Sequence, residues 1–229
     1  MIRNGRERQG GPARRVALFI VFEGIDGCGK TLQAKMLAER LERDGFSVLL
    51  TAEPSDGPIG RRLRSLKVRP SPEEETRLFT EDRRDHVTRV ILPALEEGRI
   101  VICDRYVHSS AAYQGAAGID PSRIMARNLP FIVPPDVVFL LRVPVETALQ
   151  RIRMGREGVF TSFEQRAALE AVDRIYRDIE DPAVRHIDGT GSPERVHQTI
   201  LHLFRRLMSD KDAVENRVAS GPATSGNKS

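Results

Sequence analysis

The segment that most constrains the fold is an apolar run that leads directly into a glycine-rich loop. Residues 16–22, VALFIVF, predict a buried strand, and residues 24–31, GIDGCGKT, match the G-x-x-x-x-G-K-[ST] pattern. Apolar residues at helical spacing follow from Leu32 to Leu41. A strand, such a loop and a helix N terminus together form a phosphate cradle, because backbone N–H groups and the helix dipole point at the anion. The segment predicts binding of a nucleoside triphosphate, rather than an unliganded glycine-rich turn.

Within this loop, individual residues carry separate expectations. Lys30 can reach the β- and γ-phosphates, and the Thr31 hydroxyl can hold Mg²⁺. Cys28 is an unusual residue for such a loop, and we expect its alkylation to block triphosphate binding. The residues expected to bind the triphosphate are Gly24, Ile25, Asp26, Gly27, Cys28, Gly29, Lys30 and Thr31.

Apolar runs and chain breakers predict alternating strands and helices along the rest of the chain. The expected strands are 16–22, 46–51, 99–104, 137–142 and 184–188, and the expected later helices are 59–66, 70–98, 145–153, 164–179 and 193–208. This alternation predicts a three-layer α/β domain with a mainly parallel five-stranded sheet flanked by helices. Ligands of such sheets bind beyond the carboxyl ends of the strands, where Gly24, Glu53 and Asp104 should meet.

The distribution of charge separates two tails from the domain. The chain has 229 residues and a net charge of +4, but residues 1–15 carry five arginines against one glutamate. The remainder is close to neutral, which argues against a nucleic-acid-binding module. We expect a disordered basic tail at 1–15, a single domain at 16–209 and a second disordered tail at 210–229.

Cysteine content and hydropathy bear on the compartment. The two cysteines, Cys28 and Cys103, lack metal-ligand spacing and are expected to be free thiols. No stretch approaches the roughly 18 apolar residues of a membrane span, and the start of the sequence lacks the apolar region of a signal peptide. We expect a cytoplasmic protein that does not bind membranes.

Asp104 and Arg105 follow the third expected strand. An acid at this place in phosphate-loop proteins lies near Mg²⁺, so Asp104 joins Thr31 as an expected metal ligand. Arg105 stands where NTP-driven motors commonly place a glutamate that activates water, which argues against a motor. A guanidinium here suits a second phosphate next to the transferred one. The alternative is an Asp–Arg pair that only caps the strand.

Two further groups of residues suggest a nucleotide site. Phe79 and Arg83 are four residues apart on one helix face and could stack on a base and bind its edge or a phosphate, although such a pair alone is more typical of core plus surface charge. Arg151, Arg153 and Arg156 lie in a glycine-containing segment at about 151–163. A mobile arginine there could close over the reacting phosphates as a lid, and a basic surface turn is the alternative.

Four motifs, in order, resemble those of the thymidylate kinase family. They are FEGIDGCGKT at 22–31, Glu53-Pro54, LFTEDR at 78–83 and DRYVHSSAAYQG at 104–115. The last run is highly specific for the family, whereas the phosphate loop alone would fit other nucleoside kinases. Ala52 replaces the arginine that precedes Glu-Pro in the family.

The resemblance implies a nucleoside monophosphate kinase fold, transfer of a phosphoryl group from ATP to dTMP with Mg²⁺, and a homodimer formed through helices including that of Phe79. It also implies that Lys30, Asp26, Arg105 and the lid arginines Arg153 or Arg156 are catalytic, as in bacterial members whose catalytic arginine lies in the lid. The dTMP site that it implies comprises Asp26, Glu53, Phe79, Arg83, Arg105, Ser109, Ser110, Tyr113 and Gln114.

Within this site, the family pattern implies a role for each side chain. Phe79 would stack on thymine, Arg83 would bind the base edge or the monophosphate, and Arg105 would bind the acceptor phosphate. Two other readings stay open. One is the same chemistry on another nucleoside monophosphate, and the other is a nucleotide-binding switch without turnover.

Overall fold

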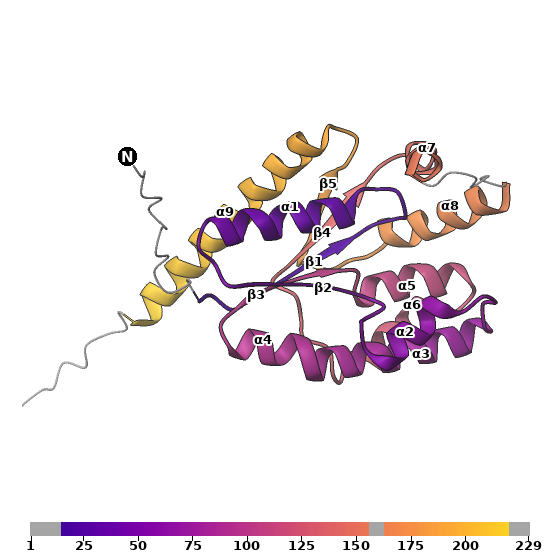
Figure 1. Cartoon of the computed structure of the whole chain (residues 1–229), viewed down its shortest axis with the longest axis horizontal. Helices are drawn as coiled ribbons and strands as arrows, with labels where there is room; N and C mark the ends of the chain where they lie inside the picture. Colours follow the sequence, from indigo (N-terminus) through magenta and orange to yellow (C-terminus); the bar gives the residue numbers. More distant parts are fainter. Residues whose placement is uncertain (1–14, 156–162, 220–229) are drawn as a thin grey trace, which may run out of the picture.

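The computed structural model of the protein describes residues 15–155 and 163–219 (Figure 1). Its strands are β1 (Leu18–Glu23), β2 (Val48–Ala52), β3 (Ile100–Asp104), β4 (Val137–Arg142) and β5 (Val184–Asp188). Its α-helices are α1 (Lys30–Arg43), α2 (Pro58–Ser65), α3 (Pro72–His86), α4 (Leu92–Glu96), α5 (Val107–Ala116), α6 (Pro121–Asn128), α7 (Val145–Gly155), α8 (Phe163–Arg177) and α9 (Pro193–Ala219). A π-helical segment, Val87–Ile91, joins α3 to α4.

The five strands form one parallel sheet in the order β2-β3-β1-β4-β5. Helices α1 and α9 cover one face, and α3 to α6 lie on the other (Figure 1). The predicted three-layer α/β architecture is confirmed. Asp104 pairs in register with Phe22 of β1 and with Ala52 of β2, so three strands end at the same edge of the sheet. The loops that follow these strands are therefore brought together, as expected.

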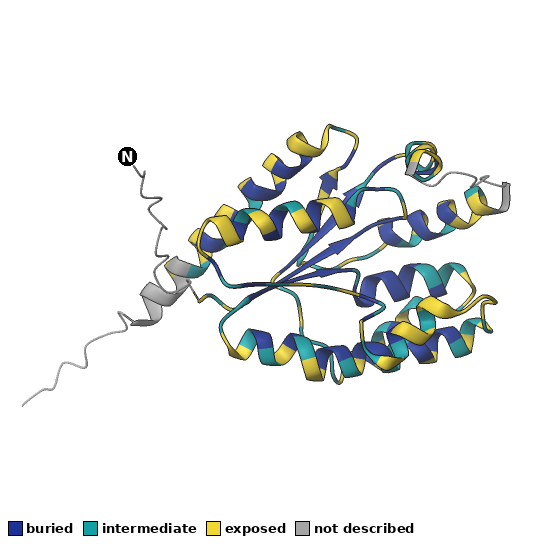
Figure 2. Ribbon diagram, in the orientation of Figure 1, coloured by how far each residue is buried: buried dark blue, intermediate teal, exposed yellow. Residues whose placement is uncertain are grey.

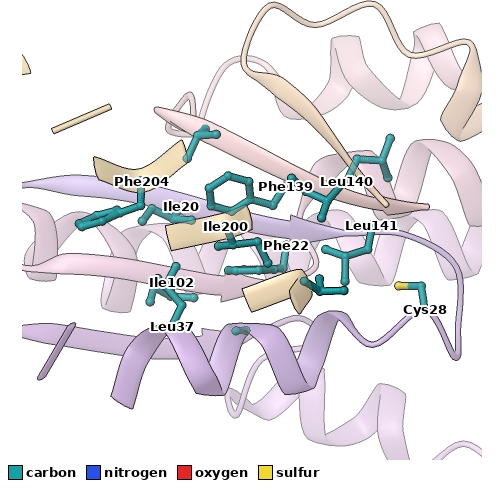
Figure 3. Close-up of a cluster of buried hydrophobic side chains, with 14 of the residues drawn as sticks. Ile20, Phe22, Cys28, Leu37, Ile102, Phe139, Leu140, Leu141, Ile200 and Phe204 are labelled. Carbon is teal, nitrogen blue, oxygen red and sulfur yellow. The ribbon is translucent and has the colours of Figure 1, made fainter. Parts of the chain in front are cut away.

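Two apolar clusters, one on each face, hold the layers together. Alternate residues of β1 point to opposite faces of the sheet and so belong to different clusters. Ile20 and Phe22 pack in the first cluster, with α1 and α9, whereas Phe19 and Val21 pack in the second, with Val87. Strands β1 and β3 are buried along their whole length in the centre of the molecule, whereas the edge strands β2 and β5 are only partly buried (Figure 2). In the first cluster, side chains of α1 and α9 such as Leu37 and Ile200 lie against β1, β3 and β4 (Figure 3).

The long helix expected over 70–98 is present with one irregularity. The Ser71 hydroxyl accepts a hydrogen bond from the backbone N–H of Glu74 and caps α3, which begins at Pro72. The π-helical segment precedes Pro93, which cannot donate to a carbonyl of the preceding turn. A wider turn there lets the helical path continue to Glu96.

Helices α5 and α6 were not expected from the sequence. In α5, small and polar residues such as Ser109, Ser110 and Gln114 are buried together with alanines. The helix therefore lacks the apolar stripe on which sequence reading depends.

The C-terminal boundary expected at residue 209 is wrong, because α9 continues to Ala219. Lys211 pins this extension to the sheet: its Nζ lies 2.9 Å from Asp136 Oδ1 and donates to the Ala17 carbonyl at 3.0 Å. The rest of the two expected tails, 1–14 and 220–229, lies outside the described residues. Among the helices that the structure describes, none combines the length and the apolarity needed to cross a bilayer.

Candidate active site

The phosphate loop follows β1 and leads into α1, as predicted. Gly29 precedes Lys30 with φ +99°, and a Cβ built on it would meet no atom within 4 Å. Gly27 has φ +82°, and a Cβ there would lie 2.3 Å from the Ala148 carbonyl oxygen. Side chains are therefore disfavoured at both positions by conformation, and at Gly27 also by space. The first turn of α1 contains no acidic residue and has no side-chain cap among the described residues, so its N–H groups are available to an anion.

Thr31 and Asp104 are brought together from α1 and the end of β3. The Thr31 hydroxyl donates to Asp104 Oδ2 at 2.5 Å. Asp104 Oδ1 is buried and has no hydrogen-bond partner among the described residues. An unpaired carboxylate oxygen beside a hydroxyl, next to a phosphate loop, fits the ligand preference of Mg²⁺.

Asp26 and Arg105 join the phosphate loop to the β3–α5 loop. Their side chains form a short ion pair, and the Asp26 backbone N–H donates to the Tyr113 hydroxyl at 3.0 Å. Lys30 Nζ lies 3.5 Å from Asp26 Oδ1. Burial alone would raise the pKa of Asp26, but Arg105 and Lys30 together hold it below the usual aspartate value. Asp26 is thus a carboxylate shared by two cations.

Arg105 has a left-handed backbone with φ +76°, which is costly for a non-glycine residue. Hydrogen bonds on both sides hold it: its N–H donates to the Phe22 carbonyl at 2.9 Å, and its carbonyl accepts from Cys103 Sγ at 3.0 Å. The guanidinium lies over the Tyr113 ring, 4.9 Å from the centroid. Burial raises the pKa of Tyr113 to about 12, so this phenol is protonated at neutral pH.

A cavity lies beside this pair, and its walls come from α3, α5 and the loops after β1, β2 and β3. Phe79 is only partly buried there, with Arg83 one helical turn further along α3. All nine residues expected at the dTMP site line it: Asp26, Glu53, Phe79, Arg83, Arg105, Ser109, Ser110, Tyr113 and Gln114. Pro54, Arg69 and Tyr106 line it as well.

Arg83 is almost fully buried, and protein groups hold its guanidinium. Its Nε donates to Glu53 Oε2 at 2.8 Å, Nη1 to Asn128 Oδ1 at 2.8 Å and Nη2 to Ser110 Oγ at 2.9 Å. His86 contacts the other oxygen of the same carboxylate, since its Nδ1 lies 3.3 Å from Glu53 Oε1. Arg105, and not Arg83, is the arginine that forms an ion pair with the phosphate-loop residue Asp26.

Comparison with known proteins identifies the family. The profile described as Thymidylate kinase matches residues 22–200, which is more than half of the chain. The chain belongs to the thymidylate kinase family. The thymidylate kinase of Desulfotalea psychrophila is 41% identical over 193 residues, covering 83% of this chain and 95% of that protein. That of Akkermansia muciniphila is 44% identical over 184 residues, covering 80% and 88%.

A solved structure agrees with these relatives. The thymidylate kinase of Ehrlichia chaffeensis superposes with a TM-score of 0.64 at 30% identity, covering 83% of this chain and 99% of that one. The predicted fold and family resemblance are thereby confirmed.

The lid expected in this thymidylate kinase family member is only partly described. Arg153 is exposed near the end of α7, whereas Arg156 lies outside the described residues. Arg151 points to the phosphate loop, since it donates to the carbonyls of Cys28 at 3.3 Å and Gly189 at 3.0 Å. It thereby ties α7 to the phosphate loop and to the loop after β5.

Cys28 belongs both to the phosphate loop and to the first apolar cluster. Its thiol is buried and points into the apolar cluster beside Leu141 (Figure 3). Burial raises the pKa of the thiol, which lowers its thiolate content at neutral pH. Burial should therefore slow the alkylation of Cys28, while the block of triphosphate binding by alkylation stays a prediction. Cys103 is also a free, buried thiol.

Glu23 is a site residue that sequence reading missed. It is fully buried at the end of β1 and accepts hydrogen bonds from the backbone N–H groups of Tyr106 and Ser109 and from the hydroxyls of Ser109 and Tyr176. These bonds tie the end of β1 to the start of α5 and to α8. The sequence did contain a signal for this residue: an acid directly follows the seven apolar residues 16–22 at the end of the strand.

A second cavity lies beside Thr31 and Asp104, with Ala52 in its wall. Thr31, Asp104, Ala52 and Arg64 line it. Arg64, from α2, donates to the Ser55 carbonyl at 2.7 Å and pairs with Asp56. Arg64 thus places a guanidinium beside Ala52, where the family sequence carries an arginine.

Proposed function

We propose that this protein phosphorylates dTMP to dTDP with ATP. One observation carries the proposal: a single cavity holds a stackable ring, a buried arginine and a second arginine, and it adjoins the phosphate loop through Asp26. Such an arrangement can hold two anionic nucleotides with their phosphates facing each other.

In this proposal, the chain's own groups supply positioning and charge. The phosphate-loop N–H groups and Lys30 bind the donor phosphates, and Arg105 binds the acceptor phosphate. Asp26 holds Lys30 and Arg105 together and would lie near the sugar of the bound dTMP. No general base is required, because an acceptor phosphate oxygen is already an adequate nucleophile. Thr31 and Asp104 would hold Mg²⁺, which supplies charge neutralisation at the transferred group.

The base pocket would be formed by Phe79 as the stacking ring and Arg83 at the base edge. Ser109 and Ser110 would line it, while Tyr113 would crowd the 2′ position of the sugar and favour a deoxyribose. A lid arginine, Arg153 or Arg156, would complete the charge neutralisation. The cytoplasmic location and the homodimer belong to the same proposal and rest on the family resemblance.

A panel of monophosphates tests the proposal. The full chain with ATP and Mg²⁺ should convert dTMP with a higher kcat/KM than dUMP, dCMP, dGMP or dAMP. Faster turnover of dUMP or dCMP would identify the alternative, a kinase for another monophosphate. Binding of ATP without turnover of any monophosphate would identify a nucleotide switch.

A further inference from the structure

The two ends of the Gln114 side-chain amide have different surroundings. Gln114 is 2% exposed and lines the cavity beside Asp26 and Arg105. Its Nε2 donates to Glu75 Oε2 at 3.3 Å. Its Oε1 is buried and has no hydrogen-bond partner among the described residues. An unpaired buried acceptor in a ligand cavity indicates that a ligand group completes the bond.

The position of this amide follows from two facing helices. Glu75, Phe79 and Arg83 recur every four residues and therefore share one face of α3. Ser110 and Gln114 share one face of α5 in the same way. Arg83 Nη2 bonds to Ser110 Oγ at 2.9 Å, and Glu75 bonds to Gln114. The Phe79 ring thus lies between two polar contacts, and a base stacked on it would meet groups from both.

Glu75 decides which end of the amide faces the cavity. It is buried, does not line the cavity, and as a carboxylate offers only acceptors. Its other oxygen, Oε1, lies 3.3 Å from Arg69 Nε. If the Gln114 amide were reversed, its oxygen would face a carboxylate oxygen. The observed orientation therefore directs the Gln114 oxygen, an acceptor, towards the ligand.

We propose that Glu75 is a specificity-determining positioning residue that selects bases with a hydrogen at N3. Thymine and uracil carry an N3–H that can donate to Gln114 Oε1, whereas N3 of cytosine is an acceptor and would leave two acceptors facing each other. The inference rests on the proposed function, since it concerns the acceptor nucleotide of the same cavity. It concerns discrimination against cytosine and does not depend on the 5-methyl group.

Glu75→Gln tests this inference. An amide at position 75 can pair with Gln114 in either orientation, so Gln114 can turn its nitrogen towards cytosine at little cost. We expect the ratio of kcat/KM for dTMP to that for dCMP to fall roughly 10-fold, while KM for ATP stays unchanged. Glu74→Gln is the matched control. It removes the same charge one residue away, where Glu74 pairs with Arg77 outside the cavity, and should leave the ratio as in the wild type.

A folded Glu75→Gln protein with the wild-type dTMP/dCMP ratio would overturn the inference. If that variant does not fold, NMR of wild-type protein with [15N3]dTMP decides. The imino proton of bound dTMP should exchange much more slowly than that of free dTMP, and equally fast exchange would contradict the bond to Gln114. Failure of the wild type to phosphorylate dTMP would instead reject the proposed function, so the two failures are distinguishable.

Discussion

Arg105 is the residue on which the two halves of the site depend. Its left-handed backbone is held between β1 and β3, and its side chain meets Asp26, Ser109 and Tyr113. The sequence indicated a phosphate ligand here from residue type and strand position. The positive φ could not be predicted, because arginine rarely adopts it and the stabilising contacts come from distant strands.

Arg105→Ala should weaken dTMP binding while ATP binding is retained. The reason is that the guanidinium lies on the acceptor side of Asp26, whereas Lys30 and the α1 N terminus remain. Loss of a charge-assisted contact predicts an increase in the Kd for dTMP on the order of 100-fold. Calorimetric titration with each nucleotide measures this. Arg185→Ala, an exposed change in β5, serves as control. Unchanged dTMP affinity in Arg105→Ala would contradict the assignment.

At the scale of elements, α1 and α9 pack on one face of the sheet and bury His197 between them. His197 is 8% exposed, and its Nδ1 is buried with no hydrogen-bond partner among the described residues. Burial, together with the cations Arg40 and Arg43, lowers the pKa of His197 below its model-peptide value of 6.5. The sequence predicted both helices. The sequence could not show that His197 is buried, because several of its neighbours in α9 are polar.

The lowered pKa of His197 predicts a pH dependence of stability. The unfolded chain binds this proton more readily than the folded chain, so His197 reduces stability as pH falls through about 6.5 and has no effect well above it. The slope from one group cannot exceed about 1.4 kcal/mol per pH unit. Urea unfolding at pH 7.5 and 5.5 should show a larger loss for the wild type than for His197→Gln. Equal losses in both proteins would reject this assignment.

The lid at the end of α7 carries a second element-scale prediction. If Arg153 or Arg156 neutralises charge during transfer, its replacement by alanine should lower kcat by roughly 10²- to 10³-fold with a small change in the Kd for ATP. Single-turnover assays of Arg153→Ala and Arg156→Ala separate the two candidates. Arg166→Ala on α8, which removes an ion pair with Glu146 of α7, should retain activity. Near wild-type kcat in both lid variants would exclude a lid arginine.

At the scale of the whole molecule, the family resemblance predicts a homodimer through the surface that includes α3. Sedimentation equilibrium should give a mass near twice the 25.6 kDa of the chain. The mass should be constant over micromolar concentrations, because a stable dimer does not dissociate in that range. A single species at the mass of one chain would contradict the predicted dimer.

The sequence by itself determined the sheet class, the phosphate loop and the pairing of Thr31 with Asp104. Each of these is a local pattern: an apolar run, glycines at fixed spacing, or an acid at a strand end. It also predicted the acceptor residues through the run at 104–115, because that motif is contiguous. Such local patterns can be recognised from the sequence, because backbone preference and hydrophobic periodicity act over only a few residues.

Only the tertiary structure decided which partners these residues meet. The α5 helix lacks an apolar stripe, so its existence depends on burial between α3, α6 and α8. Glu23 and Glu75 act through donors many residues distant in sequence, and Lys211 extends α9 by reaching Asp136. Such contacts are set by the packing of layers rather than by chain neighbours. The sequence therefore identifies the candidate site residues, and the packing of the layers orients their side chains.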